Sequence, residues 1–160
     1  MYSEFATDIY GRKITKEDKN DRHVGKVCVL GLGYQMGAPK LQMTLARGAL
    51  GGPKIALSLD QCKHIVNTYR RKYYAIKQGW DRCSTWIEHM ANPDAEPIQY
   101  KCLEIGYEYI RLPNGMSLKY PDLRKARGDK DWDEWSYQSG DLRKKIYGGL
   151  LCENLVQALA

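Results

Sequence analysis

A change of residue pattern between Asn92 and Ile98 constrains the fold of this 160-residue chain most strongly. Before the change, apolar residues recur at helical spacing, most regularly over 59–77. After Pro97, a run rich in Tyr and Ile alternates as far as Leu112, which is typical of β-strands. We therefore expect a mainly α chain of the α+β class with a small antiparallel hairpin region. The expected ranges are 1–97 for helices, 98–147 for hairpins and a loop, and 148–160 for the start of a further helix.

Local signals divide the first part of the chain into separate helices. Gly11 can end the first helix, and Pro39 can occupy the first turn of the third. Ser58 and Gln61 have the spacing of a capping box at the start of the fourth helix. Before the second helix, Thr15 is a capping residue followed by an acidic first turn. The expected helices cover 2–10, 15–30, 39–50, 59–77 and 80–91.

Turn-forming and polar residues separate the strands that are expected after Pro97. The run Leu112-Pro113-Asn114-Gly115-Met116 is a hairpin turn signal, and Ser117–Tyr120 is the expected return strand. Polar residues over 121–134 predict a loop. Two short strands are expected at 135–138 and 145–147, and a helix from Leu150 onward.

The charge balance and the cysteines limit the class of protein. A net charge of +6 with a pI of about 9.0 favours acidic partners, of which phosphates are the commonest. Five cysteines without a CxxC pair argue against a disulfide framework and against a structural zinc site. The N-terminus does not have the pattern of a signal peptide, and no run approaches about 18 consecutive apolar residues. We expect no membrane partner and a reducing cytoplasm.

The most informative stretch places Arg22, Lys26, Leu30 and Tyr34 four residues apart each time. On a helix this spacing forms one slowly drifting stripe. Along the stripe, two cations are followed by an apolar residue and then by an aromatic residue. A nucleoside triphosphate has the same order, from its charged tail through its sugar to its base. Two cations on consecutive turns can bracket a triphosphate, one as a planar fork and one as a point charge.

Three other interpretations of these residues and their surroundings stay open at this stage. The stripe can be an ordinary solvated helix face. Lys26–Leu30 can be a strand followed by a dinucleotide-binding turn with Gly31, Gly33 and Gly37, which would make the chain an NAD(P)-binding Rossmann-type fragment. The chain can also be a basic nucleic-acid-binding module, in which Arg143, Lys144 and Lys145 are the best candidates for DNA contact.

The stripe and its flanks resemble the fingers segment of family A DNA polymerases, which are DNA polymerase I-like enzymes, in their phage-type form. Arg22-x3-Lys26-x3-Leu30-Gly31-x2-Tyr34 is similar to motif B of that family, and Leu30-Gly31-Leu32-Gly33-Tyr34-Gln35-Met36-Gly37 looks like its phage version. The resemblance extends to Phe5–Gly11 upstream, and to Leu112–Gly115 and Tyr147–Ala158 downstream. It therefore covers nearly the whole chain, 1–160, as one fingers fragment with the start of a palm-side helix at 148–160.

The resemblance implies a role for each matching residue. Arg22 and Lys26 would contact the triphosphate of the incoming dNTP, and Lys26 could act as general acid toward the leaving pyrophosphate. Leu30 would pack on the deoxyribose, and Tyr34 would stack by the templating base and gate its entry. Gln157 would lie near the minor groove of the primer–template DNA.

Two positions depart from the family pattern. Many relatives carry Asn at the position of Glu153, and this difference weakens the assignment of the family's DNA-contact role to Gln157. Leu30 stands where many carry Phe or Tyr, so we expect weaker acceptance of dideoxynucleotides than in a Tyr-bearing relative.

The metal-binding motifs of the family are not in this sequence. Motif A would lie before Met1 and motif C after Ala160, so the ligands of the Mg²⁺ ions used by the complete enzyme are expected outside this chain. We expect the chain alone to be inactive as a nucleotidyltransferase. Its expected partners are dNTP, primer–template DNA and the remaining palm and thumb segments, in a bacterial host cell, encoded by a phage or prophage.

Overall fold

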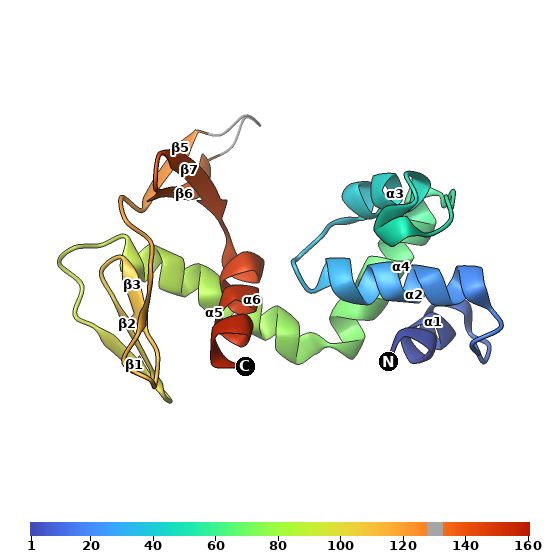
Figure 1. The fold of residues 1–160 in the computed structure, drawn as a ribbon, viewed down its shortest axis with the longest axis horizontal. Coiled ribbons are helices and arrows are strands. Elements are labelled where there is room, and N and C mark those ends of the chain that lie inside the picture. Colours follow the sequence, from blue (N-terminus) through green and yellow to red (C-terminus); the bar gives the residue numbers. More distant parts are fainter. Residues whose placement is uncertain (128–132) are drawn as a thin grey trace. The chain divides into compact units, whose positions relative to one another are not determined.

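Helices fill the first part of the chain and strands begin at Ile98, as the sequence predicts. The computed structural model describes residues 1–127 and 133–160 (Figure 1). The chain divides into two compact units, Met1–Gln78 and Gly79–Ala160, each described here by itself. Helices and small antiparallel sheets together confirm the expected α+β class.

The first unit is helical. Its elements are α1 (Tyr2–Tyr10), α2 (Lys19–Leu32), α3 (Ala38–Ala46), the short 3₁₀ helix η1 (Ala49–Gly51) and α4 (Leu59–Lys72). Helices α1, α2, α3 and α4 pack on one another around a buried core that includes Phe5, Val24, Cys28, Leu41 and Cys62.

Gly25 allows α1 and α2 to approach closely. A Cβ at this position would lie 2.3 Å from the backbone oxygen of Tyr2 and 3.0 Å from the Cβ of Ala6. Only a residue without a side chain fits this contact, so Gly25 sets how α2 is seated on α1.

The boundaries of α2 and α3 differ from expectation. Helix α2 begins at Lys19 rather than at Thr15, because a carboxylate oxygen of Asp18 accepts the backbone N–H of Thr15 at 2.9 Å and holds a turn there. Helix α3 ends at Ala46 rather than at 50, and Gly48 follows in the left-handed conformation with φ 76°.

The predicted helix over 59–77 is interrupted at Tyr73, where φ is −106° and ψ is 47°. Helix α4 ends before this residue, and α5 (Tyr74–Met90) follows it without the break that was expected near 78–79. The Tyr73 ring packs against Phe5 and Tyr69, with centroid separations of 5.9 and 4.8 Å. The break therefore follows from a tertiary cluster with α1, which the local pattern does not reveal.

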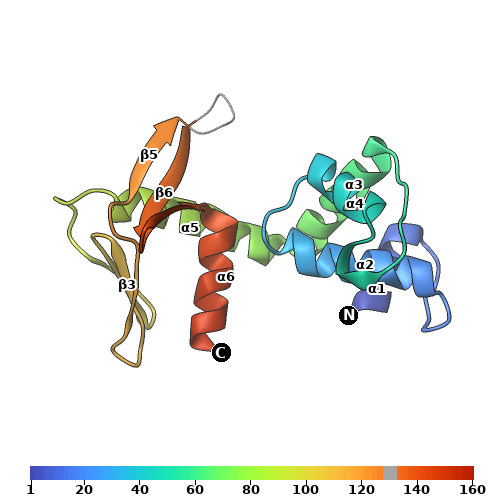
Figure 2. The same ribbon diagram turned by 45° about the horizontal axis from the view of Figure 1, so that its top comes forward.

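The second unit combines two helices with two antiparallel sheets (Figure 2). The first sheet has the order β1 (Ile98–Tyr100), β2 (Leu103–Gly106), β3 (Tyr109–Arg111) and β4 (Ser117–Lys119). The second sheet has the order β5 (Arg124–Arg127), β6 (Asp133–Ser139) and β7 (Leu142–Ile146). Helix α6 (Gly148–Leu159) completes the described part of the unit.

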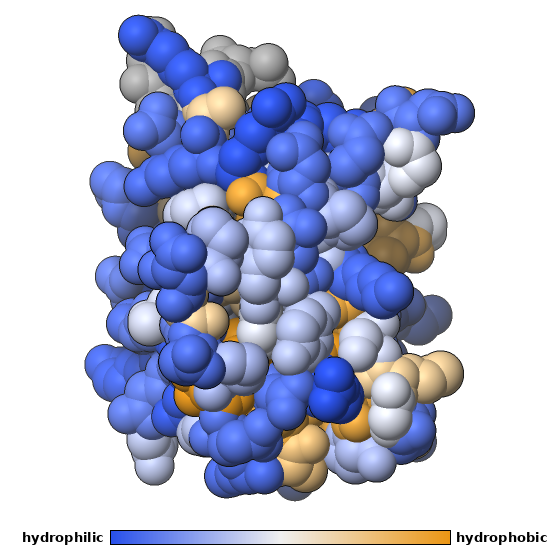
Figure 3. Space-filling model, turned by 90° about the vertical axis from the view of Figure 1, so that its left-hand side faces the viewer, coloured by the Kyte–Doolittle hydropathy of each residue, from blue (hydrophilic) through white to orange (hydrophobic). Residues whose placement is uncertain are grey.

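The core of the second unit lies between these helices and sheets. Buried residues of the core include Trp86, Met90, Ile105, Ile110 and Leu151. The face seen in Figure 3 is largely hydrophilic, with small apolar patches between charged side chains.

The hairpin over 109–119 is confirmed, whereas the region after it contains more strand than expected. The predicted loop over 121–134 contains β5 and the first residues of β6, and its residues 128–132 lie outside the described part of the chain. All four residues of β5 are exposed, so its sequence carries no apolar alternation, and the strand is defined by its pairing with β6.

Candidate nucleotide and DNA contact sites

The motif residues of α2 lie on the side of the helix that turns away from its core contacts. At 3.6 residues per turn, Arg22, Lys26 and Leu30 fall within one sector of the helix. The buried residues of α2 fall in the opposite sector and include Val24, Val27, Cys28 and Leu32. Arg22 and Lys26 are half-buried, and Leu30 is 42% exposed.

Tyr34, the fourth residue of the predicted stripe, lies beyond the end of α2. Its backbone N–H donates to the carbonyl of Gly31 at 3.2 Å, in a turn that follows Leu32. The side chain is 37% exposed, and the next residue, Gln35, has a positive φ of 62°. Leu30 and Tyr34 are thus large exposed side chains that follow the two cations along the chain, which suits a ligand that has both charged and apolar parts.

The sequence predicts no specific role for His23, yet this side chain of α2 packs against Gly52, in the segment that follows α3. A Cβ at Gly52 would lie 1.9 Å from Cε1 of the His23 ring, so the ring packs directly on the glycine backbone. The Nε2 atom of His23 is buried and has no hydrogen-bond partner among the described residues. The Gly51–Gly52 pair was the sequence signal for this contact, because only glycine permits so close an approach.

Acidic residues surround the start of α2. Arg12 forms ion pairs with Asp18 and with Asp21. The hydrogen bond from the Thr15 backbone N–H, followed by that from Arg12, lowers the pKa of the Asp18 carboxyl. Negative charge at a helix N-terminus is favourable, so these groups stabilise the helix that carries the motif.

The structure separates the three cations predicted to contact DNA. Along β7, Arg143 and Lys145 pair with Gln138 and Ser136 of β6, whereas Lys144 pairs with Tyr137. Because successive side chains of a strand point to opposite faces, Lys144 lies on the other face of the sheet from its two neighbours.

Arg143 and Lys145 form ion pairs with acidic residues of the second unit. The Arg143 guanidinium pairs with the Asp122 carboxylate and donates to the Asp122 carbonyl at 3.2 Å and to the Ser136 hydroxyl at 3.0 Å. Lys145 pairs with Glu134 at 2.5 Å. Both cations therefore have partners that would compete with a phosphate.

Gln157 is exposed on α6, in the second unit. It lines an open groove together with residues of β4 and β6, among them Lys119 and Tyr137. The α2 residues belong to the first unit and the predicted DNA contacts to the second, so they form two separate candidate sites.

The structure is inconsistent with the dinucleotide-binding alternative. That alternative requires a strand over Lys26–Leu30, but these residues lie inside α2. The strands in the described parts of the chain pair only in antiparallel fashion. A Rossmann-type unit needs a parallel strand–helix–strand arrangement.

The described residues contain no group of three or more His, Cys, Asp or Glu side chains that could hold a metal ion. In the same part of the chain, no helix is long and apolar enough to cross a membrane.

Comparison with known proteins shows a distant similarity to a phage protein. The chain is 29% identical over 149 residues to a DNA polymerase of Bacillus phage SP02, in an alignment that covers 87% of this chain. The chain spans 22% of the length of that polymerase. No protein-family model matches the chain, and no solved structure matches it. The similarity supports a relation between this chain and a phage DNA polymerase.

Proposed function

We propose that the chain is the fingers segment of a family A DNA polymerase of phage type, and that the outward side of α2 holds the incoming dNTP. The observation that carries the proposal is the placement of Arg22, Lys26 and Leu30 on the α2 side opposite its buried residues. The distant similarity to a phage DNA polymerase supports the same assignment.

In this proposal the two cations bind the triphosphate. Arg22 offers a planar fork of donors, and Lys26, one helical turn later, offers a compact charge. Bound near the bridging oxygen of the leaving pyrophosphate, the Lys26 ammonium would also donate a proton to it.

The apolar end of the same side would bind the nucleoside. Leu30 would pack on the deoxyribose, and Tyr34 would stack by the templating base and gate its entry. A leucine cannot stack or donate a hydrogen bond, so contact with the sugar would depend on shape alone.

The chain would act in DNA replication together with primer–template DNA and the palm and thumb segments of a longer enzyme. The metal chemistry of phosphoryl transfer would be supplied outside the described residues, and we assign no step of it to this chain.

Calorimetric titration of the chain with dATP tests this proposal. We expect Lys26→Ala and Arg22→Ala each to weaken binding about tenfold, since each removes one charge-assisted contact worth roughly 1.5 kcal/mol or more. Lys63→Ala is the matched control, because Lys63 is an exposed lysine of the same unit that pairs with Asp60 on α4. Equal affinity in all four proteins would refute the proposed triphosphate site.

A basic nucleic-acid-binding module is the second candidate function. It is favoured by the exposed cations of β5 and by Lys144 on β7. Salt-sensitive DNA binding by a chain that does not bind dATP would favour this candidate over the first.

A further inference from the structure

A pair of thiols in the second unit lies where α5 and α6 meet. Cys83 belongs to α5 and is 3% exposed, and Cys152 belongs to α6 and is partly exposed. The Cys83 thiol donates a hydrogen bond to the Cys152 sulfur. Neither residue takes part in the proposed nucleotide or DNA contacts, so the pair calls for a separate explanation.

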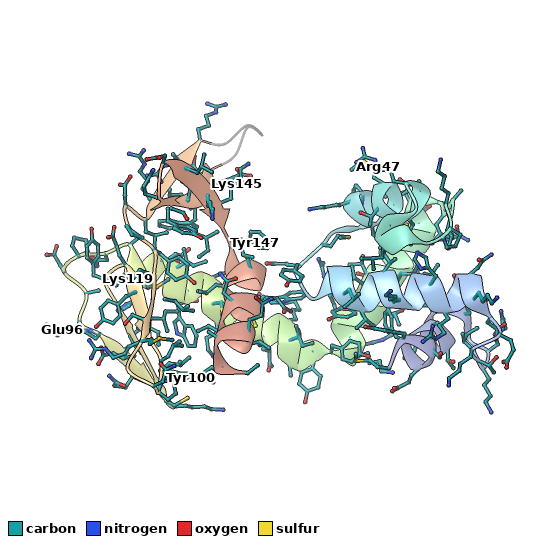
Figure 4. All side chains as sticks on the ribbon, in the orientation of Figure 1. Arg47, Glu96, Tyr100, Lys119, Lys145 and Tyr147 are labelled. Carbon is teal, nitrogen blue, oxygen red and sulfur yellow. The ribbon has the colours of Figure 1, made fainter. Side chains whose placement is uncertain are left out.

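Two glycines bring the helices together at this point. A Cβ at Gly79, one turn before Cys83 on α5, would lie 3.3 Å from the Cys152 sulfur. Gly148 lies one turn before Cys152 and directly after Tyr147 (Figure 4), and a Cβ there would clash with a backbone oxygen of α5. The two backbones therefore approach closely on the turns that carry the thiols, which holds the two sulfurs side by side.

The two thiols differ in reactivity. The hydrogen bond from Cys83 lowers the pKa of Cys152 to about 7, so at neutral pH about half of Cys152 is the reactive thiolate. The same hydrogen bond, followed by burial, raises the pKa of Cys83 and keeps this residue in the thiol form. Cys152 can therefore be oxidised first, and Cys83 lies next to it as the second thiol of a disulfide.

Cys28 and Cys62 of the first unit provide an internal comparison. Both side chains are fully buried, and burial, followed by the charge of Cys62, raises the pKa of Cys28 to about 12. Burial raises the pKa of Cys62 as well. These two thiols have neither access to solvent nor a lowered pKa, so packing alone accounts for them.

We propose that Cys83 and Cys152 are a site of oxidative modification, at which hydrogen peroxide converts the two thiols into a disulfide that joins α5 to α6. The inference goes beyond the proposed function, and it depends on the second unit alone. In the reducing setting expected from the sequence the pair is in the thiol form, so the disulfide forms only when peroxide is supplied.

The modification takes two steps. The Cys152 thiolate attacks one oxygen of the peroxide, the O–O bond breaks, and the hydroxide that leaves takes a proton to become water. The Cys83 sulfur then attacks the sulfur of the resulting sulfenic acid, and the Cys83 proton leaves with the departing hydroxide as a second water. Both sulfurs are oxidised and one peroxide is reduced. A dithiol such as dithiothreitol reverses the modification by thiol–disulfide exchange.

Peptide mass spectrometry of the full chain tests the proposal. The folded chain is treated with hydrogen peroxide at neutral pH, its remaining thiols are blocked with N-ethylmaleimide in urea, and it is digested with trypsin without reduction. Cleavage after Arg82, Lys101 and Lys145 gives peptides 83–101 and 146–160, each with a single cysteine. We expect these two peptides to be joined, to be separated by dithiothreitol, and to account for the first disulfide that forms.

Three comparisons make the test specific. Cys152→Ala should leave Cys83 reduced, because a buried thiol with a raised pKa does not react with peroxide by itself. Cys102→Ser removes the exposed cysteine and should leave the linked peptides unchanged. In the unaltered chain, Cys28 and Cys62 should be recovered in the blocked form.

The urea midpoint of unfolding is a second readout. The chain between the two cysteines carries β1 to β7, so a cross-link restricts a long loop in the unfolded state. All four tryptophans of the sequence lie in 79–160, so tryptophan fluorescence reports on the second unit. The peroxide-treated chain should unfold at higher urea than the reduced chain, whereas peroxide should not raise the midpoint of Cys83→Ala.

The preference for this pair should depend on the fold, because only the folded chain holds the two thiols side by side. Peroxide treatment in concentrated urea should therefore give a mixture of disulfides. The proposal is overturned if peptides 83–101 and 146–160 are not joined in the folded chain, if Cys102 or the Cys28–Cys62 pair forms a disulfide first, or if the linked chain does not unfold at higher urea.

Discussion

Gly25 shows how one residue without a side chain positions a candidate site. Gly25→Ala would bring a Cβ to 2.3 Å from the Tyr2 backbone oxygen, which cannot rotate away as a side chain could. We expect an overpacking cost of about 1–3 kcal/mol, only partly offset by the gain in helix propensity of about 1 kcal/mol. Thermal unfolding should show a lower Tm for this variant.

Gly37→Ala is the matched control for that prediction. A Cβ at Gly37 meets nothing closer than Pro39 Cδ at 3.9 Å, and the backbone there is extended with φ −92°. This variant should unfold with nearly the unaltered Tm. If the two variants were equally stable, the close contact between α1 and α2 would be contradicted.

Cys152 is the second residue with a specific expectation. The Cys83 thiol donates a hydrogen bond to the Cys152 sulfur, which lowers the pKa of Cys152 to about 7 and raises that of the buried Cys83. Since the thiolate is the reactive form, alkylation of Cys152 by iodoacetamide should rise through pH 7, and peptide mass spectrometry can follow it.

Cys83→Ala supplies the control. Without the donor, the pKa of Cys152 should return toward its ordinary range, and the alkylation profile should shift to higher pH. An unchanged profile would show that the two thiols do not interact.

At the scale of elements, the capping box before α4 is confirmed in the structure. The Ser58 hydroxyl accepts the Gln61 backbone N–H at 3.1 Å, and the Gln61 side chain accepts the Ser58 backbone N–H at 2.8 Å. Ser58→Ala should lower the free energy of unfolding by about 1 kcal/mol in urea denaturation. Thr85→Ala, an exposed hydroxyl inside α5, should change it by less than about 0.5 kcal/mol, and a loss at Ser58 no larger than that would contradict the assigned cap.

Elements governed by local chemistry could be predicted, and those governed by distant contacts could not. The hairpin turn at Asn114 and Gly115 is encoded in adjacent residues, whereas the break at Tyr73 depends on Phe5, far away in the chain. Strand β5 has the sequence of a solvated loop, because an edge strand with no buried residue has no alternation to detect.

The same distinction applies to the candidate sites. The α2 side could be predicted because Arg22, Lys26 and Leu30 are evenly spaced in one helix. The groove that Gln157 lines could not be predicted, because Lys119, Tyr137 and Asn154 come from separate elements that only the fold brings together. Arg143, Lys144 and Lys145 are adjacent in the sequence and look like one basic cluster. In the structure they lie on β7, where successive side chains point to opposite faces of the sheet.

At the scale of the whole molecule, the proposed function divides between the two units. The first unit would hold the incoming nucleotide on α2, and the second carries Gln157, which the family resemblance would place near primer–template DNA. Such a division fits a segment of a longer polymerase, and the chain matches 22% of the length of the phage polymerase to which it is similar.

The most direct test of the central claim is an NMR titration of the chain with dATP, with amide shifts followed residue by residue and NAD as a parallel ligand. We expect dATP to shift the amides of Arg22, Lys26 and Tyr34 and to leave those of α6 unchanged, and we expect NAD to produce no comparable set of shifts. Shifts confined to the second unit, or the same shifts around Gly31–Gly37 with both ligands, would contradict the assignment of α2 as the triphosphate-binding helix.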